Sequence, residues 1–372
     1  MAAPDALQDP SLDPILADLA ELVNVESPSS DRAALERCAA VLAAIVERRL
    51  GSSAELVDTA AGPIVHWRAG GEPKVLILGH HDTVFPIGTL AKRPFTVADG
   101  RVTGPGVFDM KAGIVQAVHA VAALSDRDGI EIMMTPDEEL GSEASRELLE
   151  ARAQACGTVL VLEPSADGGA LKTARKGVGT FDVVVHGKAS HAGLEPEKGV
   201  NSLVAAAELI GRIATFGDPA TATTVTPTMA WSGTAENVVP AETRVRVDVR
   251  IVEPAEQPRL EAAFAGLAAD ATSVAGASVS IEGGINRPPM HPSASETLFP
   301  IAADAAASVG IEGIRGVGVG GGSDGNFTAA LGIPTLDGLG AVGGGAHADH
   351  EHVLVDHLVP RTRMLAALLA RL

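Results

Sequence analysis

The stretch IEIMMTPDEELGS (residues 130–142) joins a short apolar run to two adjacent carboxylates, Glu138 and Glu139. The run IEIMM has the length and composition of a buried strand. Neighbouring carboxylates repel each other, so a pair at a strand end is typical of one of two situations. Either the loop is solvated and acidic, or a positive group lies there and the two carboxylates have different roles.

Further buried runs and helical patterns alternate on both sides of this stretch. KVLILG (74–79) precedes it and TVLVLE (158–163) follows it, and both have the composition of a buried strand. The segments 110–124 and 142–153 lie between these runs and have apolar residues at helical spacing. Such alternation predicts an α/β fold with a largely parallel sheet.

A second pattern interrupts the first between residues 177 and 288. Here the chain reads strand, helix, strand, strand, helix, strand, which is the order of a small split βαβ domain. After Pro288 and Pro289 the first pattern returns and ends in a helix at the C-terminus. The chain of 372 residues is also too long for one ordinary core. We therefore expect one domain, residues 1–176 plus 289–372, interrupted by an inserted domain, residues 177–288.

Composition and charge argue against several classes of protein. The formal net charge is −19, aromatic residues make up 3% of the chain and tyrosine is absent, which disfavours nucleic acid and anionic membranes as partners. Cys38 and Cys156 are the only cysteines and form no CxxC pair, so a reducing compartment is expected. The acidic N-terminus lacks the features of a signal peptide, and no apolar run is long enough to span a bilayer. A cytoplasmic protein is therefore expected.

Ligand-type residues follow each predicted strand of the first domain. In open α/β sheets, ligands bind beyond the carboxyl ends of the strands. Five separate segments supply such residues: His80-His81-Asp82, Asp109, Glu138-Glu139, Glu163 and His347. Imidazoles and carboxylates are zinc ligands, and this set exceeds what one tetrahedral ion needs. It suits two ions ~3.5–4 Å apart that share a carboxylate, with one of the paired glutamates left to act as a general base.

Each of these residues alone has a simpler interpretation. Asp109 alone would be a helix N-cap, and Glu163 alone would be the polar end of a strand. Spacing does not decide whether His80 or His81 is a ligand, nor which of the paired glutamates binds metal. A metal site is favoured because five segments converge on the same rim.

Six motifs, in order, resemble those of one family of enzymes. They are GHHDTVFP (79–86), GPGVFDMKAG (104–113), PDEELGS (136–142), LEPS (162–165), GKASHAGLEPEKGVNSL (187–203) and GAHADHEHV (345–353). Together they are similar to the co-catalytic zinc peptidases of metallopeptidase family 20, and within it to the bacterial glutamate carboxypeptidases, from about residue 75 to the C-terminus. The resemblance implies a zinc-peptidase-like three-layer α/β catalytic domain with an inserted α+β, ferredoxin-like domain for dimerisation and lid closure.

The resemblance also implies a role for each ligand-type residue. The implied metal ligands are His80 and Glu163 for the first zinc, Glu139 and His347 for the second, and Asp109 as the bridge. Asp82 would orient His80 through its other ring nitrogen, and Glu138 would be the general base. A cis peptide is expected between Asp109 and Met110, and Met110 stands where the family usually has an aspartate. The cofactor would be two Zn²⁺ per subunit, with Co²⁺ or Mn²⁺ able to substitute.

The remaining histidines are not expected in the metal site. Three lie close to His347 in the sequence and are interpreted as surface residues: His350, His352 and His357. Four have no motif around them and are interpreted as structural: His66, His119, His186 and His291.

Further residues are implied to contact the substrate. His191, in KASHAG, would donate to the oxyanion of the tetrahedral intermediate in the partner subunit's site, so the resemblance implies a homodimer. Other residues implied to lie at the substrate are Asn237, Arg250, Arg287, Lys172, Ser323 and Asn326. From the pattern RVRVDVR alone, Arg250 would be an outward-facing strand residue, and only the resemblance favours a carboxylate-binding role.

The expected function is metal-assisted hydrolysis of the amide bond to a C-terminal amino acid, with glutamate as the first candidate. The substrate would be a small N-acyl amino acid or peptide, and the alternative is an N-acyl-amino-acid deacylase or dipeptidase of the same architecture. Two rival classes are a binding protein without catalysis and a nicotinamide oxidoreductase, which GxGxxG at Gly316, Gly318 and Gly321 suggests weakly. The intact ligand set argues against the first, and the late position of the glycines argues against the second.

Overall fold

The structure is a computed structural model that describes residues 9–269 and 272–372. The chain divides into two compact units. Unit 1 consists of Met1–Ala174, Pro292–Val319 and Ser323–Leu372, and unit 2 of Arg175–His291 and Gly320–Gly322. The segment expected as an insertion, residues 177–288, lies within unit 2. The first eight residues, which carry part of the signal-peptide argument, lie outside the described residues.

Unit 1 is built on a six-stranded sheet with the order β1-β2-β6-β3-β7-β14. Its strands are β1 (Glu55–Asp58), β2 (Pro63–Arg68), β3 (Val75–His80), β6 (Ile130–Thr135), β7 (Val159–Val161) and β14 (Thr335–Leu336). β6, β3, β7 and β14 pair in parallel, whereas β1 and β2 join one edge in antiparallel pairs. The four parallel strands therefore end at a common rim.

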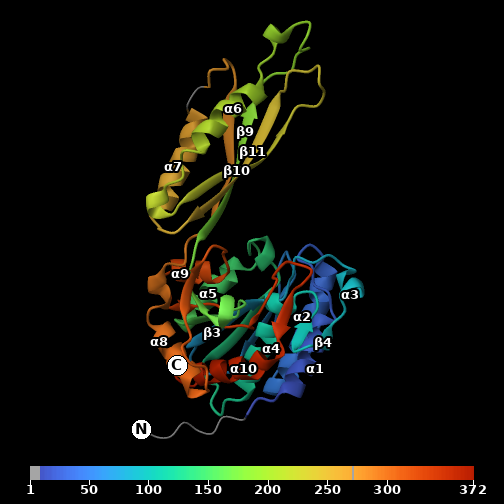
Figure 1. Cartoon of the computed structure of the whole chain (residues 1–372), viewed down its shortest axis with the longest axis vertical. Helices are drawn as coiled ribbons and strands as arrows, with labels where there is room; N and C mark the ends of the chain where they lie inside the picture. The colour runs from blue at the N-terminus through green and yellow to red at the C-terminus, as the bar shows by residue number, and fades with distance from the viewer. Residues whose placement is uncertain (1–8, 270–271) are drawn as a thin grey trace. The chain divides into compact units, whose positions relative to one another are not determined.

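Helices cover both faces of this sheet, so unit 1 has three layers (Figure 1). One core contains side chains of α1 (Leu12–Val23), α2 (Arg32–Leu50), α4 (Ala112–Ala122), α8 (Leu298–Ser308) and α10 (Val355–Leu369). The other contains side chains of α5 (Arg146–Cys156) and α9 (Gly325–Ala330). Within β3, Ile77 belongs to the first core, and Leu76 and Leu78 belong to the second. Full burial of each such side chain stabilises the fold by ~1.5–3 kcal/mol. The expected three-layer α/β architecture is confirmed.

The boundaries of α2 show how local sequence sets the ends of these helices. The side chain of Asp31 accepts a hydrogen bond from the backbone N–H of Ala34, which satisfies one of the free donors in the first turn. Gly51 ends the helix in the left-handed conformation, with φ of 78°. Between them, a stripe of apolar residues that includes Leu35, Leu42 and Ile45 is completely buried.

Smaller elements complete unit 1. A four-stranded sheet has the order β15-β16-β5-β4. Its strands are β4 (Thr96–Ala98), β5 (Arg101–Thr103), β15 (Gly343–Gly344) and β16 (His352–Leu354), and the short helix α3 is Thr89–Lys92. β8 (Leu171–Arg175) pairs with β13 (Gly316–Val319) in a separate two-stranded sheet. The glycines of the GxGxxG pattern thus lie in and after a strand outside the parallel sheet, which is not the context of a dinucleotide-binding turn.

Unit 2 contains a four-stranded antiparallel sheet and two helices. The elements follow the chain as β9 (Gly177–His186), α6 (Ser202–Ile213), β10 (Thr224–Ser232), β11 (Glu242–Ile251), α7 (Glu256–Ala269) and β12 (Ser278–Arg287). The strand order is β10-β11-β9-β12, which is the ferredoxin-like arrangement expected from the sequence. Side chains of both helices pack on one face of the sheet, where the ring of Phe264 stacks on Phe181 with centroids 3.9 Å apart.

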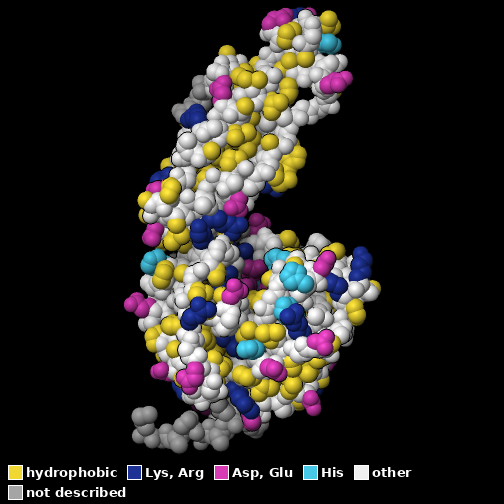
Figure 2. Space-filling model, in the orientation of Figure 1, with side chains coloured by type: hydrophobic (Ala, Val, Ile, Leu, Met, Phe, Trp, Pro, Cys, Tyr) yellow, Lys and Arg dark blue, Asp and Glu magenta, His cyan; other side chains and the backbone are white. Residues whose placement is uncertain are grey.

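The other surfaces of unit 2 retain exposed apolar side chains (Figure 2). β10 is an edge strand of the described sheet and carries Met229 and Trp231, which are 51% and 45% exposed. α6 carries Leu203 and Val204, which are 47% and 49% exposed. Within residues 9–269 and 272–372, no helix combines the length and hydropathy that crossing a bilayer requires.

Candidate metal centre

The parallel strands of unit 1 bring their following residues to one rim. His80 is the last residue of β3, where it pairs with Thr135 at the end of β6. In β7, Val161 pairs with Leu78 of β3. Glu163 lies two residues after Val161 and His80 two residues after Leu78, so Glu163 reaches the same level as His80. The loops after β6 and β7 therefore begin beside His80, as the sequence pattern predicts.

Asp109 lies between two groups of ligand-type side chains. Its Oδ1 is 3.3 Å from Nε2 of His80, and its Oδ2 is 3.2 Å from Nε2 of His347. The same nitrogen of His80 is 3.6 Å from Oε1 of Glu163, and that of His347 is 3.1 Å from Oε1 of Glu139. One carboxylate thus connects a His80–Glu163 group with a His347–Glu139 group, which is the arrangement of a two-metal site with a shared ligand.

Asp82 contacts both His80 and the backbone of the paired glutamates. Nδ1 of His80 is 3.1 Å from the carbonyl oxygen of Asp82 and 3.3 Å from its Oδ1, so a proton on Nδ1 is held there and Nε2 faces the site. The Asp82 carboxylate also accepts hydrogen bonds from the backbone N–H groups of Glu138 and Glu139, at 3.3 and 3.2 Å. Ser29 donates a further hydrogen bond to it, at 2.6 Å. A single buried carboxylate therefore orients a histidine and fixes the paired glutamates.

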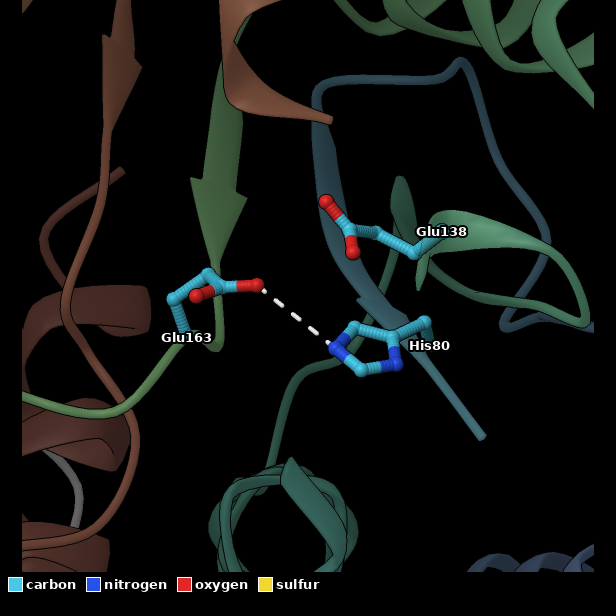
Figure 3. Close-up of side chains that lie close together, drawn as sticks. All are labelled: His80, Glu138 and Glu163. Atoms are coloured by element: carbon cyan, nitrogen blue, oxygen red, sulfur yellow. Dashed lines mark ion pairs between the residues drawn. The ribbon is translucent and has the colours of Figure 1, made fainter. Parts of the chain in front are cut away.

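Glu138 points into the same space as the first group (Figure 3). One ligand-type atom from each of His80, Glu138 and Glu163 lies within 4.8 Å of the others, and all three residues are buried. A second set within the same distance is His80, Asp109 and Glu139, of which Asp109 and Glu139 are half-buried. Geometry alone therefore places both glutamates of the pair within reach of a cation.

Charge–charge interactions perturb the protonation of these groups. Burial opposes the charged form of His80, but hydrogen bonds with Asp109, Asp82 and Glu163 raise its pKa well above the ordinary value. Hydrogen bonds with Asp109 and Glu139 raise the pKa of His347 to about 10. Burial would raise the pKa of Asp109, but His347 and His80 hold it well below its usual range. In the metal-free protein, two imidazolium groups thus offset the charge of the buried carboxylates.

The residues fit a pair of divalent cations. Oδ1 of Asp109 is buried, and apart from its 3.3 Å contact with Nε2 of His80 it accepts no hydrogen bond within the described part of the chain. Such an atom is costly to bury unless it is compensated, and a cation would compensate it. Two imidazoles with several carboxylates form a donor set of the zinc type.

Comparisons with known proteins identify the family. A profile described as "Peptidase family M20/M25/M40" matches residues 76–371. The chain belongs to this peptidase family. Carboxypeptidase G2 of Pseudomonas sp. (strain RS-16) is 31% identical over 95% of this chain and 88% of its own length. Succinyl-diaminopimelate desuccinylase of Roseobacter denitrificans is 30% identical over 79% of this chain and 82% of its own.

A solved structure of the same family has the same fold. The M20 family metallo-carboxypeptidase Sso-CP2 from Sulfolobus solfataricus superposes with a TM-score of 0.78 over 97% of this chain and 100% of its own, at 18% identity. The expected membership of metallopeptidase family 20 and the expected fold class are therefore confirmed, and the chain is a hydrolase of the M20 peptidase family.

The turn that carries Asp109 in this M20 chain is held by a residue that the sequence argument missed. The peptide between Asp109 and Met110 is cis, as the resemblance implies. The carboxylate of Glu351, which is 1% exposed, accepts hydrogen bonds from the backbone N–H groups of Gly106, Phe108 and Asp109. Burial raises the pKa of Glu351 to about 7, although these hydrogen bonds act in the opposite direction. The only sequence signal was an acidic residue four positions after His347.

The two residues after Asp109 are also buried beneath the site. Sδ of Met110 lies 3.3 Å from the backbone nitrogen of His80 and accepts its N–H, in the position where the family usually has an aspartate. Lys111 is 1% exposed, and its ammonium group donates to the carbonyl oxygens of Leu22 and Val25, at 3.3 and 2.7 Å. Leu22 lies in the last turn of α1, and Val25 lies two residues after the helix ends.

Other histidines of unit 1 have partners away from Asp109. The ring of His81 is completely buried, and its Nε2 donates to the carbonyl oxygen of Pro63 at 2.9 Å, so this ring faces β2. Nε2 of His66 is 2.8 Å from the carboxylate of Glu131, and Nε2 of His119 is 2.8 Å from that of Asp18. Of the two adjacent histidines at the end of β3, only His80 approaches Asp109.

The three expected substrate residues of unit 1 differ in their surroundings. Nζ of Lys172 is 3.7 Å from Oε2 of Glu163, so this lysine lies at the first group. Ser323 is completely buried, and its hydroxyl donates to Oδ2 of Asp337 at 2.7 Å. The side chain of Asn326 is also buried and accepts a hydrogen bond from the backbone N–H of Ser323. Both side chains hold the loop together through these contacts, and the expected proximity of Ser323 and Asn326 to a substrate stays a prediction.

The expected residues of unit 2 form two clusters within that unit. His191 and Asn237 are exposed on adjacent loops, where His191 bridges to Val238 and the N–H of Ala192 donates to the carbonyl oxygen of Asn237 at 2.8 Å. Nδ1 of His191 accepts hydrogen bonds from the backbone N–H groups of Gly193 and Leu194, both at 3.1 Å.

The second cluster is a row of two arginines across β9. Arg250 of β11 and Arg287 of β12 both pair with Val178 of β9, one on each side. Their backbones are thus separated by two strand spacings, ~10 Å. The guanidinium group of Arg250 forms two hydrogen bonds with the carboxylate of Asp248, at 3.0 and 2.9 Å, which fixes its orientation.

Proposed function

We propose that this M20 hydrolase uses two divalent metal ions to cleave the amide bond of a C-terminal amino acid, with glutamate as the preferred residue. The single observation that carries the proposal is the position of Asp109. Its two carboxylate oxygens point separately to His80 and His347, each of which has its own carboxylate partner. A shared carboxylate of this kind supports a pair of ions, for which zinc is proposed, with cobalt or manganese able to substitute.

The residues of the chain divide the work of amide hydrolysis. A pair of bound metal ions supplies polarisation of the amide carbonyl and lowers the pKa of the attacking water. Glu138 accepts the proton of that water and returns it to the departing amine, because its carboxylate is buried beside His80 and Glu163. Asp82 keeps Glu138 in place through the backbone and keeps Nε2 of His80 directed at the site.

Substrate recognition is assigned to unit 2. The row of Arg250 and Arg287 offers two cationic groups of the kind that bind a terminal carboxylate. His191 and Asn237 are exposed on adjacent loops and are proposed to donate to the developing oxyanion in the partner subunit's site. Lys172, beside Glu163, is proposed to contact the acidic side chain of the substrate.

The proposed partner is a second copy of the chain, which docks through β10 and α6. β10 is an edge strand of the described sheet, and edge strands present free hydrogen-bonding groups that a partner can use. The exposed side chains of Met229 and Trp231 on β10, and of Leu203 and Val204 on α6, provide apolar area for such a contact. This homodimer would supply His191 in trans.

The alternative function is an N-acyl-amino-acid deacylase or dipeptidase with the same chemistry. It is supported by the 30% identity with a succinyl-diaminopimelate desuccinylase, whose name indicates that it removes a succinyl group from an acylated amino acid. Both functions use the same metal centre, and they differ only in the groups that contact the substrate beyond it.

The two functions are separated by one assay. Metal-stripped protein is reconstituted with zinc, cobalt or manganese and supplied with N-benzoyl-glutamate, N-benzoyl-alanine, N-succinyl-lysine and a neutral dipeptide. We expect no hydrolysis without metal and at least tenfold higher kcat/KM for N-benzoyl-glutamate than for N-benzoyl-alanine. A clear preference for a neutral or succinylated substrate would assign the alternative, and hydrolysis by the fully metal-stripped protein would refute both.

A further inference from the structure

Glu351 connects the two segments that carry Asp109 and His347. Its Oε2 accepts a hydrogen bond from the N–H of Gly106 at 2.9 Å. Its Oε1 accepts hydrogen bonds from the N–H groups of Phe108 and Asp109, both at 3.0 Å. Both oxygens of this buried carboxylate thus accept hydrogen bonds from the backbone of one turn, residues 106–109, and these bonds hold the turn in place.

The turn at residues 106–109 is shaped for this contact. Gly106 adopts a φ of 71°, which side-chain-bearing residues rarely adopt. A Cβ at this position would lie 2.4 Å from Cγ2 of Thr83, so the turn also requires glycine for space. Because the turn directs three N–H groups to one place, it forms a small anion-binding concavity that Glu351 fills.

The segment that carries Glu351 is fixed at its other end. Four residues before it, His347 has a φ of 62°, and the backbone N–H of Glu351 donates to the carbonyl oxygen of Ala348 at 3.1 Å. Directly after it, the chain enters β16, where Val353 pairs with Val102 of β5. Glu351 therefore lies between the His347 loop and a paired strand, and it joins both to the turn of Asp109.

We infer that Glu351 is a positioning residue that sets the separation of Asp109 and His347, and with it the affinity of the His347–Glu139 group for metal. The inference rests on the proposed two-metal function. Glu351 touches neither substrate nor metal in this arrangement, since its oxygens are used by the backbone. Loss of its carboxylate loosens the backbone of Asp109 and the loop of His347 together, so the group that contains both residues is affected most.

The direct test is Glu351→Gln, which keeps the size of the side chain. Glutamine has one oxygen, so its amide nitrogen faces at least one of the three N–H donors and cannot accept from it. In metal-free protein, hydrogen exchange of the peptide that contains residues 106–109 should become at least tenfold faster. In zinc titrations at buffered free metal, one of the two ions should bind at least tenfold less tightly than in the wild type, with a smaller effect on the other ion.

Glu131→Gln is the matched control. Glu131 is another buried glutamate of unit 1, but its carboxylate is bonded to His66 and Arg152. This variant should lose thermal stability while keeping wild-type zinc affinities. Equal loss of zinc affinity in both variants would show a general effect of destabilisation and would overturn the inference, as would wild-type zinc affinities in Glu351→Gln.

Two further outcomes are also decisive. If Glu351→Gln does not fold, Glu351→Asp keeps the charge but shortens the side chain by one methylene, and unchanged exchange and zinc affinity in that variant would overturn the inference. If the wild-type protein binds fewer than two ions, the proposed function fails. The exchange measurement needs no metal and still decides whether Glu351 holds the turn of Asp109.

Discussion

Replacing Glu138 with glutamine tests whether Glu138 is the general base while its neighbour Glu139 is a metal ligand. The change is isosteric, and the backbone N–H of residue 138 keeps its hydrogen bond to Asp82, which is 3.3 Å long. The pocket beside His80 and Glu163 therefore stays filled, and only the ability to accept a proton is lost. A positioned general base contributes roughly 10²–10⁴-fold to the rate. At ~1.36 kcal/mol per decade, the barrier should rise by ~2.7–5.4 kcal/mol.

Glu139→Gln is the matched comparison, because the two residues are adjacent and receive the same support from Asp82. Oε1 of Glu139 lies 3.1 Å from Nε2 of His347, so this carboxylate belongs to the His347 group. We expect Glu138→Gln to keep two metal ions with a kcat lowered by at least a hundredfold. Glu139→Gln should lose affinity for one ion.

The measurement combines metal content after equilibrium dialysis with steady-state kinetics on N-benzoyl-glutamate. If Glu138→Gln loses an ion, Glu138 is a ligand and not the base. If it keeps a kcat within tenfold of the wild type, the proton is transferred by another group. Either result would refute the assignment of roles within the pair.

Three other predictions concern protons, substrate and assembly. Because the pKa of His347 is about 10 in the metal-free protein, its ring carries a proton at pH 7.5, and the raised pKa of His80 favours the same state, whereas metal requires neutral imidazole. Zinc binding should therefore release ~1–2 protons per subunit, and zinc affinity should increase as pH rises toward 10. Calorimetry in buffers of different ionisation enthalpy measures the released protons, and the absence of proton release would contradict the prediction. Arg250→Gln removes a charge-assisted contact worth ~1.5–3 kcal/mol, so kcat/KM for N-benzoyl-glutamate should fall roughly 10–150-fold while the metal content stays unchanged. An unchanged kcat/KM would show that Arg250 does not contact the substrate. Trp231→Glu should convert a dimer to a monomer in sedimentation velocity with little change in Tm, whereas a wild-type monomer or an unchanged dimer would place the contact elsewhere.

The parts of the fold that were predictable have local periodicity. β3 and β6 are mostly apolar because they are buried on both faces, and that composition is visible in the sequence even though Glu131 interrupts β6. The element order of unit 2 could be predicted for the same reason, since its strands are long enough to alternate. The metal centre followed from these strands, because parallel strands share a rim and His80 directly ends one of them.

The missed parts depend on contacts between distant residues. β16 and β5 are each three residues long, which is too short to show a detectable period in the sequence. They pair through residues far apart in the sequence, Val353 and Val102. Glu351 is a similar case, because its role depends on three backbone N–H groups that carry no sequence signal. The burial of Ser323 was equally hidden, since a serine among glycines is typical of an open loop and its partner Asp337 lies 14 residues away.

The buried ammonium group of Lys111 extends the support of the metal centre to the start of the chain. It lies two residues from Asp109 and binds the carbonyls that close α1, where a cation is also favoured by the helix dipole. The proposed ligands include no residue of the described segment 9–74, yet the chain just after the first helix contacts Lys111, two residues from Asp109. A shortened chain that begins after α1 would remove the Leu22 acceptor and leave the buried ammonium group with the carbonyl oxygen of Val25, so the amino-terminal helix contributes directly to the support behind Asp109.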